Sequence, residues 1–265
     1  MSTHITTQPI GIFDSGLGGL TVLAALRARL PDEDFIYFAD THFLPYGNRS
    51  ESFIQARSQA ISDMLATHGH AKLIVVACNT ATAAAAEVIR ANTHLPVVAL
   101  EPAVKPATLL TRSGVIGVLA TTRTLASQRF QRLVATHANG TQVIPQACPG
   151  LVEAIETHGP KSAPANALLD EYVPPLVQAG ADVVVLGCTH YPWAREGIAA
   201  RLPAGTRIVD TGEAVARQVE RRLQGESHLG GHGQLRLATS GNPREVQKTI
   251  THLWGTAPHV EFWQV

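Results

Sequence analysis

Short apolar runs alternate with longer stretches rich in alanine and leucine along most of this chain, and this alternation constrains its fold more than any other feature. Strands of a parallel sheet with helices on both faces are buried on both sides, so they read as nearly continuous apolar runs. Such runs predict strands over 10–14, 34–40, 72–78, 95–100, 113–120, 141–147, 181–188 and 206–210. Helices are predicted over 20–30, 50–69, 82–92 and 125–138. The predicted fold class is α/β, with mainly parallel sheets flanked by helices.

A chain of 265 residues is long enough for one large domain or for two smaller ones. Two of the predicted strands end in a cysteine, and this repetition suggests two related halves. We expect a first α/β domain that contains residues 1–100 and 209–265, and a second that contains residues 101–208. The segments LEPAVKPA and IVDTGEA would then be the two crossings between them.

The charge balance argues against a nucleic-acid partner, and the length of the apolar runs argues against a membrane span. Lysine and arginine total 21 residues, as do aspartate and glutamate, so the net charge is zero and the basic excess typical of nucleic-acid-binding proteins is missing. The N-terminal stretch has no signal-peptide pattern, and no apolar run reaches the roughly 18 residues that a membrane span needs. We expect a cytoplasmic protein that binds a small molecule and neither nucleic acid nor membrane.

The cysteines stand out because two of them share one context. Cys78 in VVACNTATA and Cys188 in VVLGCTHYP each follow an apolar strand and precede a threonine-containing segment. A buried cysteine usually acts as a small hydrophobe. At the start of a helix, however, backbone N–H groups favour the thiolate, which makes the thiol an acid or a base. Cys148 lacks this context and is interpreted as structural.

Two acid–base thiols suit one reaction in particular. The chain has no CxxC redox pair and no Cys/His spacing for zinc, and glycines interrupt the histidine segments at 68–70 and 228–232, so no metal site is predicted. Thiols on opposite sides of one substrate carbon could remove a proton from one face and return one to the other. That exchange inverts a stereocentre.

Polar residues gather where the predicted strands end, which is where parallel sheets bind ligands. Asp14 and Ser15 begin the glycine-rich turn FDSGLGGL, which could bind an anion at a helix N-terminus or simply form a tight turn. Asn79, Thr80 and Thr189 flank the two cysteines and could hold a carboxylate, although Asn and Thr are also common helix caps.

Other residues could complete such a pocket. His190 could orient Cys188, and Glu156 could reach His190 if its helix folds over the site. Tyr46 and Gly47 lie in a predicted turn of the kind that often closes pockets, and Thr121 ends another strand.

Several motifs together resemble the glutamate racemases, within the cofactor-independent aspartate/glutamate racemase superfamily. The matching segments are GIFDSGLGGLTV, DTHFLPYG, VACNTATA, EPAVKPA, GVLATTRT, GCTHYP and IVDTGEA, in order from Gly11 to Ala214. The resemblance implies two pseudo-symmetric α/β domains with the active site in the cleft between them, and interconversion of L- and D-glutamate without pyridoxal phosphate or another cofactor. It also implies a supply of D-glutamate for peptidoglycan synthesis, and it favours a homodimer.

The resemblance also assigns roles residue by residue. Cys78 and Cys188 match the catalytic pair of the family. Its substrate-binding positions fall on Asp14, Ser15, Tyr46, Gly47, Asn79, Thr80, Thr189 and His190, and supporting positions fall on Thr121, Thr124 and Glu156. Many members carry an arginine or alanine near Phe43, so a changed pocket rim is expected there.

Two alternative functions fit parts of the pattern. An aspartate or hydantoin racemase would share the paired thiols and differ in the pocket for the side chain, and the THYP segment after Cys188 favours the glutamate branch. A non-catalytic amino-acid-binding protein would fit two domains but would leave the twin cysteines unexplained.

Overall fold

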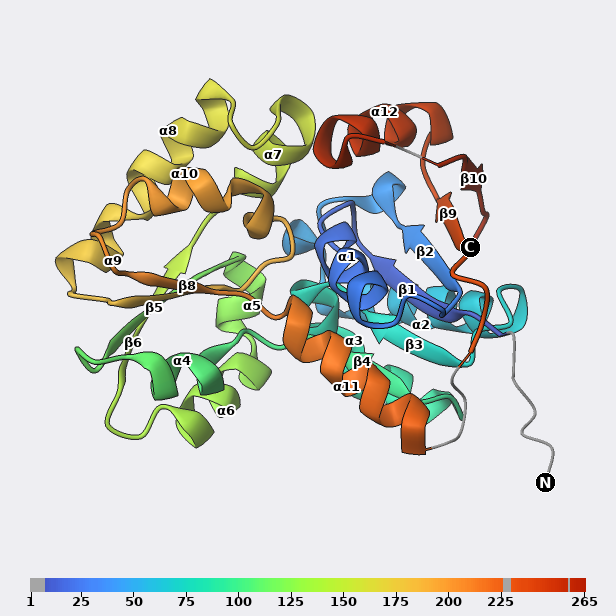
Figure 1. Cartoon of the computed structure of the whole chain (residues 1–265), viewed down its shortest axis with the longest axis horizontal. Helices are drawn as coiled ribbons and strands as arrows, with labels where there is room; N and C mark the ends of the chain where they lie inside the picture. The colour runs from blue at the N-terminus through green and yellow to red at the C-terminus, as the bar shows by residue number, and fades with distance from the viewer. Residues whose placement is uncertain (1–7, 226–229, 257) are drawn as a thin grey trace. The chain divides into compact units, whose positions relative to one another are not determined.

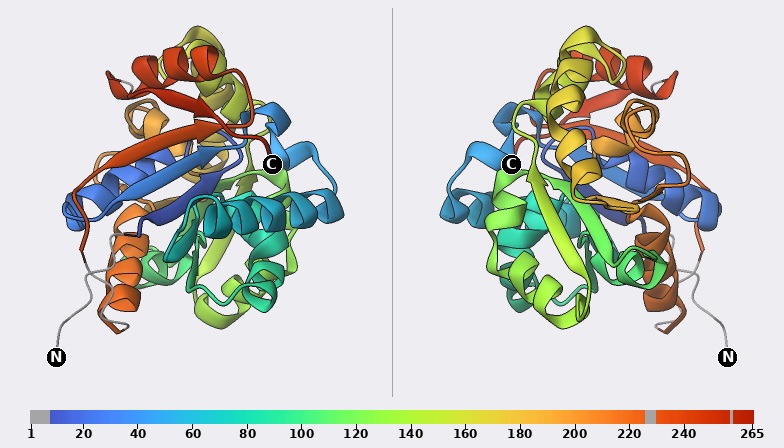
Figure 2. Two further views of the ribbon diagram at one scale, coloured as in Figure 1. Left: turned by 90° about the vertical axis from the view of Figure 1, so that its right-hand side faces the viewer. Right: turned by 90° about the vertical axis from the view of Figure 1, so that its left-hand side faces the viewer.

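The first of two parallel sheets gathers strands from distant parts of the sequence. The computed structural model describes residues 8–225, 230–256 and 258–265. Within them this sheet has six strands in the order β10-β9-β2-β1-β3-β4, and all pairings are parallel. The strands are β1 (Ile10–Asp14), β2 (Phe35–Ala39), β3 (Leu73–Val76), β4 (Val97–Ala99), β9 (Leu235–Thr239) and β10 (Val260–Phe262). Figure 2 shows the red β9 and β10 beside the blue strands of the N-terminal segment.

The helices of this part of the chain cover the first sheet. They are α1 (Leu20–Arg29), α2 (Glu51–Thr67), α3 (Asn79–Asn92), α11 (Gly212–Gly225) and α12 (Pro243–Trp254), with short 3₁₀ turns η1 (Thr41–Phe43) and η2 (Tyr46–Asn48). Ser50 caps α2 by accepting a hydrogen bond from the Phe53 N–H at 3.2 Å. The buried face of α2 carries Ile54, Ile61 and Leu65 at helical spacing, and they join one core cluster with β3 and α3.

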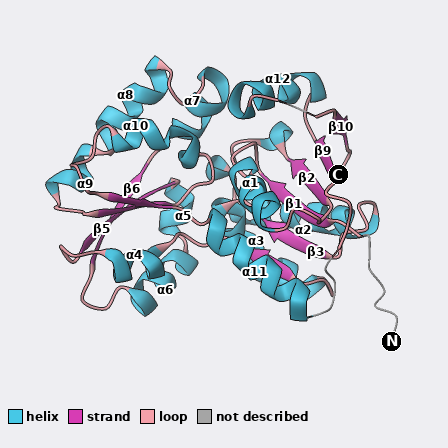
Figure 3. Cartoon of the chain, in the orientation of Figure 1, coloured by secondary structure: helices cyan, strands magenta, loops and turns pink. Residues whose placement is uncertain are grey.

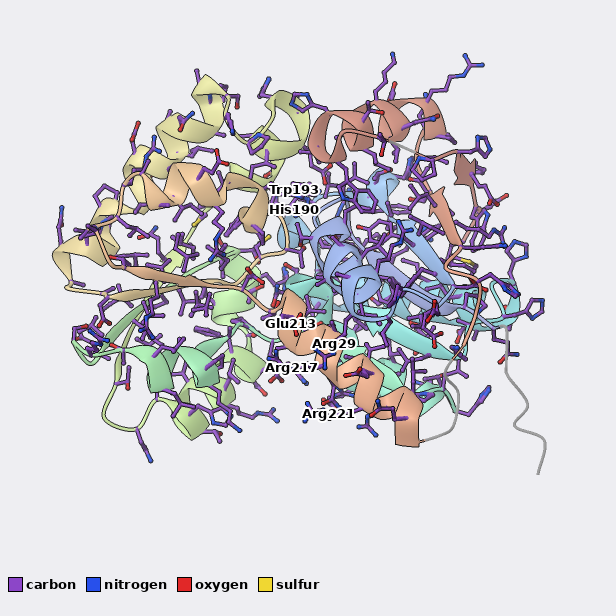
Figure 4. The ribbon with its side chains drawn as sticks, viewed as in Figure 1. Arg29, His190, Trp193, Glu213, Arg217 and Arg221 are labelled. Carbon is purple, nitrogen blue, oxygen red and sulfur yellow. The ribbon has the colours of Figure 1, made fainter. Side chains whose placement is uncertain are left out.

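Ion pairs connect α1 to α11 on the surface of this unit. Arg29 on α1 lies 3.0 Å from Glu213 and 2.6 Å from Glu220, both on α11. Figure 4 shows Arg29 beside Glu213 on the neighbouring helix. Pairs this exposed contribute about 0–1 kcal/mol each, so the buried leucine and valine side chains of the two helices supply most of the attachment.

The second sheet has four strands, also all parallel, in the order β6-β5-β7-β8 within the described residues. Its strands are β5 (Val115–Ala120), β6 (Gln142–Ala147), β7 (Val183–Leu186) and β8 (Arg207–Val209). The helices are α4 (Val104–Leu110), α5 (Thr122–Ala126), α6 (Gln128–His137), α7 (Leu151–His158), α8 (Ala163–Tyr172), α9 (Pro174–Gln178) and α10 (Arg195–Ala199), with the 3₁₀ turn η3 (Tyr191–Ala194). Figure 3 shows α4 and α6 on one side of this sheet and α8 and α10 on the other.

The chain divides into two compact units, each built around one sheet. One contains the described residues up to Leu100 together with those from Gly212 to Val265, and the other contains Glu101–Thr211. Figure 1 labels their elements. The α/β class and the two parallel sheets flanked by helices, predicted from the sequence, are confirmed. The bounds expected for two folding domains, 1–100 with 209–265 and 101–208, stay a prediction.

The predicted elements differ from the observed ones in three places. The helix expected over 125–138 is divided at Ser127, whose extended backbone and side chain cap α6 by accepting from the Phe130 N–H at 3.1 Å. The helix expected from residue 82 begins earlier, at Asn79. Strands β9 and β10 were not predicted, because the charged residues Arg236 and Glu261 interrupt their apolar residues.

Two predictions concern residues that are only partly described. Residues 1–7, which belong to the stretch judged to lack a signal peptide, lie outside the described residues, as does His228 of the segment at 228–232. In the described part of the chain, no helix combines the length and apolar character that crossing a membrane requires. No group of three or more His, Cys, Asp or Glu side chains there is placed to hold a metal ion.

Candidate active site

Cys78 and Cys188 follow equivalent strands of the two sheets. The first four strands of each unit, numbered along the sequence, have the same order in their sheets: β2-β1-β3-β4 and β6-β5-β7-β8. The first strand is flanked by the second on one side and by the third, followed by the fourth, on the other. Cys78 follows the third strand β3, and Cys188 follows the third strand β7. In each sheet the strand order changes direction beside these ends, and ligands of open parallel sheets bind at such a point.

The sulfur of Cys78 is held at the start of α3. The residue is the N-cap of that helix, and its Sγ accepts from the Ala81 N–H at 3.4 Å. Ser15 Oγ lies 3.5 Å from the same sulfur. Cys78 is 5% exposed. A backbone N–H of a first helical turn is a donor that suits negative charge on sulfur.

The glycine-rich turn after β1 binds its own carboxylate. Asp14 accepts from the Ser15 N–H at 2.7 Å and from the Gly19 N–H at 2.5 Å. Asp14 is fully buried beside Ser15 at the end of the strand next to β3. Of the two alternatives left open by the sequence, the geometry favours a tight turn ordered by Asp14, since these two amides already have an acceptor.

Asn79 is the most informative polar residue of the first unit. It is 4% exposed, and neither Oδ1 nor Nδ2 of its side chain has a hydrogen-bond partner among the described residues. Leaving a buried polar group unsatisfied costs about 1–3 kcal/mol, and such a group in a native fold needs an explanation. Its neighbour Thr80 is equally buried. A ligand that bonds the Asn79 amide would remove this cost.

Tyr46 lies close to Cys78 in the same buried cluster. Its hydroxyl donates to Asp40 Oδ2 at 2.6 Å, and the residue is 1% exposed. Burial raises the pKa of the Tyr46 phenol far above its usual value, and the neighbouring Asp40 and Cys78 raise it further. The phenol therefore remains a neutral hydrogen-bond donor. Gly47 follows it within the same 3₁₀ turn.

A chain of three side chains supports Cys188 in the second unit. Cys188 Sγ lies 3.8 Å from His190 Nδ1, and His190 Nε2 lies 2.6 Å from Glu156 Oε1. Burial alone would lower the pKa of His190, but its hydrogen bonds to Cys188 and Glu156 raise that pKa well above the ordinary value. The approach of Glu156 to His190 expected from the sequence is present, with the imidazole 2% exposed. A protonated imidazole beside sulfur is a common way to stabilise a thiolate.

The remaining predicted residues of the second unit lie at the same edge of its sheet. Thr121 follows β5 and caps α5, because its Oγ1 accepts from the Thr124 N–H at 3.2 Å. The two hydroxyls are 2.9 Å apart. Thr189, beside Cys188, is 5% exposed.

Cys148 differs from the other two cysteines. Burial raises the pKa of its thiol to about 12, and its Sγ donates to the Gln146 carbonyl at 3.5 Å. A thiol with so high a pKa stays protonated near neutrality and is unsuited to serve as a base there.

The structure thus gathers the predicted residues into two sets, one in each unit. The unit of Cys78 contains Asp14, Ser15, Tyr46, Gly47, Asn79 and Thr80, and the unit of Cys188 contains Thr121, Thr124, Glu156, Thr189 and His190.

Comparison with known proteins identifies the family. The Asp/Glu/Hydantoin racemase family model matches residues 20–219. The chain belongs to this racemase family.

Relatives with a stated activity are similar over nearly their whole length. The glutamate racemase of Pseudomonas paraeruginosa is 47% identical over 257 residues, which cover 96% of this chain and 97% of the relative. A solved structure of a glutamate racemase isoform from Bacillus anthracis has a TM-score of 0.90 and 28% identity, and covers 99% of both chains. That of Escherichia coli glutamate racemase, solved with L-glutamate and the activator UDP-MurNAc-Ala, has a TM-score of 0.84 and 32% identity over 96% of this chain and 97% of the neighbour.

The sequence does not predict the burial of two further residues, Arg57 and Trp193. Arg57 on α2 is nearly buried against Asp40, although an arginine in a helix ordinarily faces water. Trp193, labelled near His190 in Figure 4, has a buried indole N–H with no partner within the described ranges. No sequence signal marks Arg57, because its partners are distant in the chain, but the position of Trp193 just after the THYP segment could have drawn attention to it.

Proposed function

We propose that this racemase interconverts L- and D-glutamate, with Cys78 and Cys188 as its two acid–base groups. The observation that carries the proposal is their equivalent placement after the third strand of two sheets, in which the first four strands along the sequence have the same order. The identity of 47% to a glutamate racemase supports the choice of substrate within the family.

The proposed reaction conserves every atom of the substrate. One sulfur, as thiolate, takes the α-proton, and the electron pair of the broken C–H bond moves into the substrate carboxylate. The other sulfur, as thiol, then delivers its proton to the opposite face of the same carbon. The product is the mirror image, and the protonation states of the two sulfurs have been exchanged. This requires both sulfurs to reach one α-carbon, and donors around the carboxylate to stabilise the charge that develops there.

Other residues supply binding and electrostatics in this proposal. The amide of Asn79, which has no hydrogen-bond partner among the residues that the structure describes, suits a substrate carboxylate, as do the helix-end N–H groups of α3. The phenol of Tyr46, whose proton is donated to Asp40, is a neutral side chain in the same cluster as Cys78. In the second unit, Glu156 holds His190, which faces Cys188. We assign Asp14, Ser15, Gly47, Thr80 and Thr189 to the substrate site, and Thr121 and Thr124 to its support.

The biological role follows from the product. We propose that the enzyme supplies D-glutamate for peptidoglycan synthesis in the cytoplasm, uses no cofactor, and acts as a homodimer. The neighbour from Escherichia coli was solved with an activator whose name denotes a peptidoglycan precursor, which supports a link of that protein to the same pathway. Rescue of a bacterium that needs external D-glutamate would test the role.

The decisive experiment follows the α-proton. L-glutamate and D-glutamate are incubated separately with the protein in deuterium oxide, while circular dichroism follows optical activity and NMR follows deuterium at the α-carbon. Loss of optical activity with deuterium incorporation from both enantiomers is expected. L-aspartate in place of glutamate distinguishes an aspartate racemase, and glutamate that binds without deuterium uptake would indicate a binding protein and overturn the proposal.

A further inference from the structure

We propose that Arg57 is a positioning residue, which fixes the Tyr46 hydroxyl at the candidate active site through the buried carboxylate of Asp40. The inference rests on the proposed function only for its kinetic consequences. None of the motifs that resemble the racemases includes Arg57, which lies within α2.

The contact between Arg57 and Asp40 is bidentate. Arg57 Nη2 donates to Oδ1 at 2.7 Å, and Arg57 Nε donates to Oδ2 at 2.9 Å. The Asp40 side chain is fully buried, and that of Arg57 is 10% exposed. Two parallel N–H···O bonds fix the plane of the carboxylate as well as its position, which a single bond or a lysine would not do.

Tyr46 depends on the same carboxylate. Its hydroxyl donates to Asp40 Oδ2 at 2.6 Å, so this oxygen accepts from both the phenol and the guanidinium. Without Arg57, Asp40 would be a buried charge without a cation, which is costly enough to draw in water. That water competes with the bond from Tyr46. Because Tyr46 and Cys78 belong to one cluster, the effect would reach the thiol site.

Two further contacts keep the guanidinium in place. Arg57 Nη1 donates to the Val265 carbonyl at 2.7 Å, and the guanidinium carbon lies 4.5 Å from the centre of the Phe43 ring. The ring of Phe43 also lies 5.4 Å from that of Phe53 on α2. The residue expected to alter a pocket rim therefore packs against Arg57. Arg57 connects the C-terminal segment, the loop after β2 and Tyr46.

The test uses full-length Arg57→Met, Arg57→Lys and Tyr46→Phe, together with the double variant Arg57→Met/Tyr46→Phe. Arg201→Met is the matched control, because Arg201 likewise bonds a carboxylate, Asp170, at 2.7 Å and backbone carbonyls, but lies in the other unit. Urea unfolding establishes that each variant is folded, and kcat and KM for both glutamate enantiomers are measured.

We expect Arg57→Met to lower kcat/KM by at least about tenfold. Tyr46→Phe should lower it as well, and the double variant should be no worse than the poorer of the two single variants. Arg57→Lys should recover part of the loss. Single effects that multiply in the double variant, or an Arg57→Met variant whose kinetics equal those of Arg201→Met, would overturn the inference.

A second readout does not depend on the substrate. The four tyrosines are replaced by 3-fluorotyrosine, and the ¹⁹F resonance of Tyr46 is assigned by its loss in Tyr46→Phe. Arg57→Lys should shift this resonance, whereas Arg201→Met should not. An unshifted Tyr46 signal in folded Arg57→Lys refutes the inference even if the protein acts on glutamate. A shifted signal with no turnover of glutamate by the unaltered protein rejects the proposed function alone.

Discussion

His190 Nε2 lies 2.6 Å from Glu156 Oε1, so a buried imidazole and a largely buried carboxylate form one hydrogen-bonded pair beside Cys188. Glu156→Gln removes the negative charge and keeps the shape, and we expect it to lower the pKa of His190, since Glu156 is one of the two groups that raise it. NMR titration of the His190 ring measures this directly. Glu171→Gln, an exposed change on α8, is the control, and an equal pKa in all three proteins would contradict the prediction.

The same pair should make stability depend on pH. The pKa of His190 in the folded chain lies above its unfolded value of about 6.5, so its protonated form stabilises the fold fully below that pH. This contribution is lost as the pH rises through the folded-state pKa. The difference in free energy of unfolding between the wild type and His190→Gln should therefore shrink as the pH rises above about 6.5. Urea unfolding at a series of pH values checks this, and a difference that grows with pH would be the wrong sign.

Each cysteine variant should separate racemisation from exchange. Cys78→Ala and Cys188→Ala should each lower racemisation by about 10²–10⁴-fold, the range for a lost acid–base group, while exchange of the α-proton persists from one enantiomer. Cys148→Ala should keep nearly full activity, because that thiol is buried and has a high pKa. Circular dichroism and deuterium uptake are the measurements. Normal racemisation by Cys78→Ala or Cys188→Ala would exclude that sulfur from the reaction.

Asn79 should matter for substrate binding and little for folding. Because its amide has no partner within the described residues, Asn79→Ala loses no hydrogen bond on folding. We expect an unchanged or higher urea midpoint and a KM for glutamate raised by about 10–100-fold, as for a lost bond to a charged group. Asn166→Ala is the contrasting variant, since its amide donates to the carbonyls of Lys161 and Ser162. It should lower the midpoint and leave KM alone.

The ion pair of Lys72 and Glu33 provides a test of stability away from catalysis. Lys72 Nζ lies 2.5 Å from Glu33 Oε2, and the two side chains are 1% and 3% exposed. Lys72→Met leaves a buried carboxylate without its cation and should cost about 3–5 kcal/mol of unfolding free energy. Lys72→Met/Glu33→Met should recover most of this loss. A double variant less stable than Lys72→Met would show that the charges are not the cause.

The core strands could be predicted because their burial on both faces leaves a nearly continuous apolar pattern. Strands β9 and β10 could not, because Arg236 interrupts the apolar residues of β9, and β10, at the sheet edge, has Glu261 in its middle and an exposed Phe262. The division of the helix at Ser127 depends on one side-chain bond to the Phe130 N–H. The residue types in this segment are compatible both with this cap and with an uninterrupted helix, so they do not decide between the two.

The candidate site also contains both residues that the sequence predicts and residues that it does not. The cysteines and the residues beside them follow apolar strands, so their place at the ends of those strands was predictable. Arg57 was not, because Asp40 is 17 residues away and Val265 is 208 residues away in the sequence. The hydrogen bonds of Asp14 to its own turn depend on backbone geometry that residue types do not specify.

The place of β9 and β10 within the first sheet determines the order in which a newly made chain can be completed. All strands of the second sheet leave the ribosome before either of them, so β2 must wait for its second partner, β9, which is encoded some two hundred residues downstream. At about 5–20 residues per second, the segment from Gly212 to Val265 takes roughly 3–11 s to synthesise. Throughout that interval the β2 edge is open to association with other nascent chains, and Arg57 lacks the Val265 carbonyl that later anchors it.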